Sequence, residues 1–162
     1  KKSESANKCL HFSIPYDIID LYYKSIGDHP MATKYYRTPH LVYDCKYHVI
    51  FCPKYRRRIL VNGLDELVKT VFRKIAEQKG FQIIEMEVMP DHVHLLISCN
   101  PQYGIMNCIR VLKRYSAAPM REFDPSLDRR LPSIWTRSAF IATVGSVSLE
   151  TVKAYIESQK EQ

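Results

Sequence analysis

The chain has 162 residues, of which 46% are hydrophobic and 25% are charged, and this length and composition are typical of one globular domain. These values exclude a fibrous repeat, a wholly disordered chain and a large multi-domain protein. The formal net charge is +7, which indicates a polyanionic partner, most often a nucleic acid.

The excess positive charge is not spread evenly. Residues 1–30 hold four basic and four acidic side chains, whereas 20 basic and 13 acidic side chains follow from Met31 onward. We therefore expect an N-terminal appendage at 1–30 and a functional domain at 31–162.

Membrane and disulfide patterns are both missing from the sequence. No run approaches the ~18 apolar residues of a membrane span, and no signal-peptide pattern opens the chain. The five cysteines are odd in number and lack CxxC spacing, which favours reduced thiols. We expect a cytoplasmic, nucleoid-associated protein with no membrane partner.

In chain order, the first regular elements are a strand and a helix. Polar and apolar side chains alternate over residues 43–51, which predicts a strand that Pro53 ends. Apolar residues then recur with a helical period over 64–75, and Gly80 marks the C-terminal end of that helix.

A hairpin and a second helix follow. Residues 81–89 and 92–99 read as strands joined by a turn at Pro90 and Asp91. The next helix is predicted from Ile105 to about Ala117, and the Pro-, Asp- and Arg-rich residues 118–132 are expected to form a loop.

The last elements are short strands and a terminal helix. Residues 134–143 predict one bent strand or two short ones, and Ser148 is the expected N-cap of the terminal helix. The resulting βαββαβ order predicts an α+β, ferredoxin-like antiparallel sheet of the split βαβ type. Both helices then cover one face of the sheet, and the first and third strands are central neighbours.

A histidine pair begins the third strand. Alternation places His92 and His94 on one face of the sheet, and Val93 and Leu95 on the helix-covered face. Two imidazoles side by side can chelate a metal ion, although a pair of surface histidines gives the same pattern. The cysteines and histidines of a classical zinc site or a zinc deaminase are missing. Further ligands would be oxygen atoms, which favours Mg²⁺ or Mn²⁺.

Taken together, six segments resemble the single-tyrosine HUH transposases of small insertion sequences, the IS200-like family, and the related REP-associated tyrosine transposases. They occur in family order across residues 43–159. The segments are Tyr47–Leu60, Val88–Leu96, Leu112–Ser116, Ile134–Phe140, Thr143–Gly145 and Tyr155–Gln159. Residues 1–30 match nothing in the family.

The resemblance implies a role for each matching residue. His92, His94 and Gln159 correspond to the metal ligands, and Tyr155 corresponds to the nucleophile on the terminal helix. The family cuts and rejoins single-stranded DNA at the ends of its element through a 5′-phosphotyrosyl intermediate, and recognises hairpins near those ends. It acts as a homodimer in which a terminal helix can complete the partner's site.

Basic side chains gather in two places. The predicted DNA contacts are Lys54, Tyr55, Arg56, Arg57 and Arg58 after the first strand, and Arg110, Lys113 and Arg114 on the second helix. A solvated surface is the alternative for each group, and DNA contact is favoured for the group after the first strand. His48 and Asp91 are expected close behind the metal site, where His48 is a ligand, a phosphate contact, a general acid or base, or a structural residue.

Three other functions stay open on the sequence alone. A non-catalytic module that binds single-stranded nucleic acid explains the charge and the fold. A structural metal-binding interaction protein explains the histidines. An HUH nickase of the replication-initiator or relaxase type shares the chemistry but differs in the product.

Overall fold

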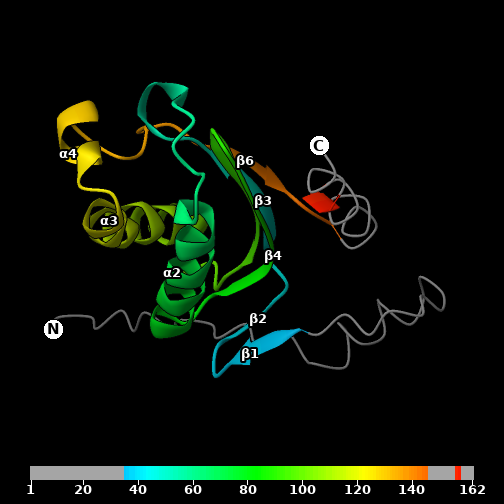
Figure 1. Ribbon diagram of the computed structural model, residues 1–162. Helices are drawn as coiled ribbons and strands as arrows, with labels where there is room; N and C mark the ends of the chain where they lie inside the picture. Colours follow the sequence, from blue (N-terminus) through cyan, green and yellow to red (C-terminus); the bar gives the residue numbers. More distant parts are fainter. Residues whose placement is uncertain (1–34, 146–155, 158–162) are drawn as a thin grey trace, which may run out of the picture. The chain divides into compact units, whose positions relative to one another are not determined.

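The computed structural model describes residues 35–145 and 156–157 of the chain (Figure 1). Ile156 and Glu157 are helical, within the stretch where the terminal helix is predicted. The expected appendage at 1–30, the Ser148 cap, Tyr155 and Gln159 all lie outside the described residues. The division of the chain at residue 30 stays a prediction.

A four-stranded antiparallel sheet with the strand order β4-β5-β3-β6 forms the centre of the fold. This is the order of a split βαβ fold, and β3 and β5 are central neighbours, as predicted. The strands are β3 (Lys46–Phe51), β4 (Gln82–Met89), β5 (His92–Ser98) and β6 (Phe140–Thr143).

Two helices, α2 (Leu64–Lys79) and α3 (Ile105–Phe123), cover one face of this sheet (Figure 1). The core between them contains Val49, Phe72, Val93, Leu95 and Leu112, all fully buried. Burial of each such side chain stabilises the fold by about 1.5–3 kcal/mol. The odd-numbered residues of β3 and β5 therefore face the helices, and the even-numbered residues face the other side.

The opposite face has a small apolar cluster of its own. Leu96 is fully buried there and packs with Val144 and Ile156, with the partly buried Ile84 beside them. Ile156 thus packs against the sheet on the face that carries the histidines.

The predicted first strand is too long at its N-terminal end. Residues 41–43 form β2 (Leu41–Tyr43), which pairs with β1 (Tyr36–Thr38) in a separate two-stranded sheet. Asp44 separates β2 from β3 and forms an ion pair with Lys46. The alternation over residues 43–51 continues through Asp44, so the pattern alone could not show the break there, although aspartate is rare in strands.

The prediction that residues 118–132 form a loop is wrong. α3 continues through Pro119 to Phe123, and α4 (Ser126–Arg130) follows. Proline costs α3 one backbone hydrogen bond, but Met120 extends the buried stripe of the helix and is fully buried. Leu127, also fully buried, anchors α4 in the same way.

Between Ile134 and Thr143 only β6 is a strand. Trp135 forms a single antiparallel bridge with Pro53, and its ring is buried in the core. Among the helices of residues 35–145 and 156–157, none is long and apolar enough to cross a membrane.

Candidate metal and DNA site

The candidate site lies on the sheet face that the helices leave open. His92 and His94 come from the first residues of β5, and His48 comes from the neighbouring β3. In the register of the two strands His94 is opposite Ile50, and His48 is opposite Leu96. The prediction that His92 and His94 share one face is confirmed, and topology brings His48 beside them.

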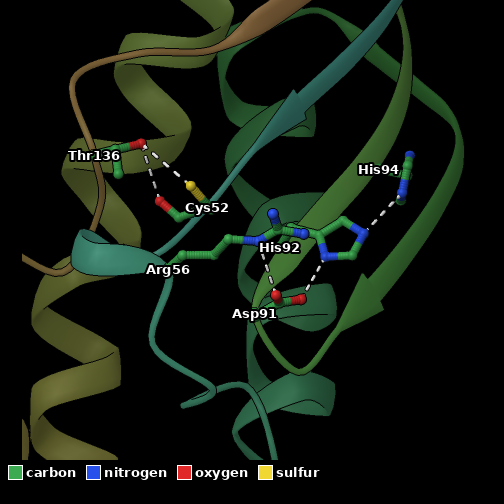
Figure 2. Close-up of polar contacts among 6 residues, drawn as sticks. All are labelled: Cys52, Arg56, Asp91, His92, His94 and Thr136. Atoms are coloured by element: carbon green, nitrogen blue, oxygen red, sulfur yellow. Dashed lines mark hydrogen bonds and ion pairs between the residues drawn. The ribbon is translucent and has the colours of Figure 1, made fainter.

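Five side chains at this site form a continuous series of contacts, and Figure 2 shows four of them, Arg56, Asp91, His92 and His94. Asp91 Oδ1 lies 2.6 Å from His92 Nδ1, and Asp91 Oδ2 accepts a hydrogen bond from Arg56 Nε at 2.9 Å. His92 Nε2 lies 3.0 Å from His94 Nε2. On its other side, His94 Nδ1 lies 3.2 Å from His48 Nε2.

The contacts of Asp91 with His92 and of His48 with His94 determine which imidazole nitrogens can bind a cation. A carboxylate only accepts hydrogen bonds, so His92 donates through Nδ1 and the Nε2 of the neutral ring carries a free lone pair. His94 Nε2 carries one as well when His94 Nδ1 donates to His48. Two lone pairs 3.0 Å apart repel unless a proton or a metal ion lies between them.

This geometry fits a divalent ion. With a metal–nitrogen distance of about 2.1 Å, the two Nε2 atoms would be about 90° apart at the ion, the angle between neighbouring ligands of an octahedron. Within residues 35–145 and 156–157, no group of three His, Cys, Asp or Glu side chains could hold a metal ion. A complete site therefore needs another ligand, and the predicted one, Gln159, lies outside these residues.

Burial favours the neutral form of His94 and His48. His94 is 2% exposed, and burial, followed by the neighbouring His92 and His48, lowers its pKa to about 4. Burial also lowers the pKa of His48. Neutral imidazole is the form that binds metals. At Asp91, burial opposes ionisation, but hydrogen bonds from His92 and Arg56 outweigh it and lower the pKa.

An open cavity of about 580 Å³ borders the histidine pair. Arg56 and Phe140 belong to its walls together with His92 and His94. The ring of Phe140 is 57% exposed and lies edge-on to His48, with 6.3 Å between the ring centres. The cavity thus combines an arginine, an exposed aromatic ring and the histidine pair.

The basic run after β3 contains an unusual turn. Tyr55 and Arg56 both have left-handed backbone angles, with φ of 60° and 51°, although neither residue is glycine. Tyr55 is 65% exposed, and Lys54 Nζ lies 5.2 Å from the centre of its ring. Arg57 and Arg58 are exposed. The turn thus directs Arg56 toward the site.

The three basic residues predicted on α3 differ in their surroundings. Lys113 Nζ donates to the carbonyl oxygens of Thr136 at 3.0 Å and Ser138 at 2.8 Å, and burial lowers its pKa. Arg110 and Arg114 instead line a groove of about 440 Å³.

Arg121, Trp135 and Arg137 also line this groove. Sequence analysis did not single out Arg137, because it comes from another loop and no local pattern marks it. The groove runs along α3, and α3 covers the sheet face opposite the histidines.

Comparison with known proteins gives relatives of one kind. The family model described as IS200-like transposase matches residues 41–159. The ISDra2 transposase TnpA of Deinococcus radiodurans is 42% identical over 123 residues, which are 75% of this chain and 88% of that protein. The transposase of insertion sequence IS200 from Salmonella typhimurium is 31% identical over 125 residues, 76% of this chain and 82% of that protein.

Two solved structures resemble the fold. The crystal structure of a candidate transposase from Deinococcus radiodurans is 34% identical, with a TM-score of 0.63 over 76% of this chain and 97% of that chain. A REP-associated tyrosine transposase bound to a REP hairpin has a TM-score of 0.54 at 16% identity, over 75% of this chain and 68% of that chain. The second likeness is one of fold alone.

Proposed function

Because the chain belongs to the family of IS200-like transposases, we propose that it cuts and rejoins single-stranded DNA at the ends of an insertion sequence. The observation that carries the proposal is the convergence of His92 Nε2 and His94 Nε2, 3.0 Å apart, beside a cavity that contains Arg56. Two facing lone pairs repel each other, so this arrangement destabilises the fold unless a cation or a proton lies between them. A need for stability therefore does not explain it.

Mg²⁺ or Mn²⁺ is the proposed cofactor, held by His92, His94 and Gln159. When bound, it would polarise the phosphate and offset the negative charge that develops during the reaction. His48 would accept a hydrogen bond from His94 Nδ1, so that the lone pair of His94 Nε2 points toward His92 Nε2.

Tyr155 is the proposed nucleophile. Its phenolic oxygen forms a bond to phosphorus while the bond from phosphorus to the 3′ oxygen breaks, which gives a 5′-phosphotyrosyl link and a free 3′-hydroxyl. One phosphodiester replaces another, so a 3′-hydroxyl can reverse the step and rejoin DNA without ATP. Ile156, the next residue, is buried against Leu96 and Val144 on the histidine face, which supports this assignment.

DNA would contact two surfaces of the domain. At the cavity, Arg56 offers a cation to a phosphate, and Phe140 offers a face on which an unpaired base can stack. On the other side of the sheet, the groove with Arg110 and Arg114 suits the phosphates of a folded hairpin. Hairpins at the element ends are thus the proposed DNA partners.

A homodimer is the proposed assembly. β6 is an edge strand of the four-stranded sheet, and within the described part of the chain β3 is the only strand it pairs with. An unpaired edge can accept the same edge of a second copy. In this arrangement the terminal helix would complete either its own site or the partner's.

Covalent trapping tests the proposal. The chain is mixed with Mg²⁺ and single strands that carry the cognate element ends, and a DNA adduct that survives denaturation is expected. Tyr155→Phe, the matched control, should bind the strands and form no adduct. Binding without an adduct for the unaltered chain would instead identify a non-catalytic single-strand-binding protein, and an adduct that never rejoins would indicate a nickase.

A further inference from the structure

An ion pair links the basic run after β3 to the histidine pair. Arg56 Nε donates to one oxygen of Asp91, and His92 Nδ1 donates to the other (Figure 2). We propose that Arg56 and Asp91 form a positioning pair that holds His92 in its Nδ1-protonated form, with Nε2 directed at the metal. The inference rests on the proposed function for the metal, and assigns Arg56 a role beyond DNA contact.

The backbone at Arg56 supports a dedicated role. Tyr55 and Arg56 are consecutive left-handed residues that are not glycine, a conformation that costs free energy and tends to persist at functional sites. Tyr55 is mostly exposed, so burial of its ring does not account for the turn. The contact that the turn makes possible is the one between Arg56 and Asp91.

Backbone contacts hold the loop in place without the arginine side chain. Lys54 N donates to Ile134 O at 2.7 Å, and Leu60 N donates to Pro90 O at 3.0 Å. The second bond ties the loop to the residue just before Asp91, and Leu60 itself is buried. Removal of the Arg56 side chain should therefore break the ion pair and leave the loop folded.

The neighbouring arginines provide a matched comparison. Arg57 has the same charge and is also exposed, but its side chain has no hydrogen bond or ion pair to any other residue the structure describes. It also lies outside the lining of the histidine cavity. Arg57→Ala thus removes the same charge as Arg56→Ala without touching Asp91.

The test combines two measurements on the full chain. Calorimetric titration with Mn²⁺ gives the metal affinity, and ¹⁵N NMR of the imidazoles gives the tautomer of His92 in the metal-free protein. Asp91→Ala should weaken Mn²⁺ binding about tenfold or more, in the range known for residues that orient metal ligands. Asp91→Asn keeps an acceptor and should fall between Asp91→Ala and the unaltered chain.

The arginine variants and the tautomer complete the design. Arg56→Ala should weaken Mn²⁺ binding less than Asp91→Ala, and Arg57→Ala should leave it unchanged. His92 should be protonated at Nδ1 in the unaltered chain and shift toward the Nε2-protonated form in Asp91→Ala. A role confined to folding would leave this tautomer signal unmoved.

Each outcome decides one question. Unaltered Mn²⁺ affinity and an unaltered His92 tautomer in folded Asp91→Ala and Arg56→Ala would overturn the positioning role. Absence of Mn²⁺ binding by the unaltered chain would contradict the proposed metal site, and the NMR measurement would still decide the role of Asp91. If the Asp91 variants fail to fold, Arg56→Ala carries the test, because it truncates an exposed side chain.

Discussion

The contacts of Lys113 show that this lysine, unlike the basic residues proposed to contact DNA, stabilises the fold. Its ammonium group donates to the carbonyl oxygens of Thr136 and Ser138, and lies 4.8 Å from the centre of the Phe51 ring. Lys113→Met keeps the length and the apolar stem of the side chain and removes only the ammonium. We expect this variant to lose stability and to keep its ionic contacts with DNA.

The size of the loss follows from the contacts. Each hydrogen bond from a charged group contributes about 1.5–3 kcal/mol. Thr136 and Ser138 are not buried, so water can replace the ammonium at both carbonyls, and methionine avoids the cost of burying a charge. The net loss should therefore be about 2 kcal/mol. For a chain of this size, that corresponds to a Tm lower by roughly 4–8 °C.

Two assays with one control decide the matter. Denaturant unfolding gives the stability, and the salt dependence of single-stranded DNA binding counts the phosphate contacts. Arg110→Met, an exposed change on the same helix, should keep its stability and lower the slope of log affinity against log salt by about 0.7. Lys113→Met with unchanged stability and a lower slope would refute the structural role.

Three further outcomes are expected. Ser116→Ala should cost about 1–3 kcal/mol in denaturant unfolding, since the Trp135 Nε1 that donates to Ser116 Oγ at 2.9 Å is left buried without a partner; an unaltered midpoint would contradict this. Cleavage should stop in excess chelator and return when Mg²⁺ or Mn²⁺ is added, whereas the His92→Ala variant should not regain cleavage. Full activity in excess chelator would exclude the metal requirement. Mixed dimers of Tyr155→Phe and His92→Ala should regain about one competent site, whereas no recovery after confirmed subunit exchange would place each site within one chain.

The sheet and its two faces could be predicted because alternation in β3 and β5 is regular. Once β3 and β5 were assigned as central neighbours, the positions of His48 and His94 on one face followed from topology. The end of α3 could not be predicted from the local pattern, because a proline such as Pro119 usually ends a helix. Only the burial of Met120, a tertiary effect, shows why the helix continues.

The histidine pair was predictable from sequence, and its surroundings were not. A His-x-His pattern on a strand is local, whereas the Arg56–Asp91 contact joins residues 35 positions apart. The left-handed turn at Tyr55 has no sequence marker, since glycine and asparagine are the usual residues there. The sequence likewise does not distinguish Lys113 from a surface cation, because the carbonyl groups that it contacts, those of Thr136 and Ser138, lie on a loop distant in the sequence.

Ile156 bears on whether the terminal helix serves its own site or a partner's. Its side chain is fully buried against Leu96 and Val144, a contact that stabilises the docked segment by about 1.5–3 kcal/mol. In a symmetric dimer both copies have the same apolar contact surface at Leu96 and Val144. Ile156 would therefore be buried to the same extent on the partner's sheet as on its own. In the proposed dimer, burial of Ile156 therefore gives no preference between the chain's own sheet and the partner's, and only the mixed-dimer experiment can decide between them.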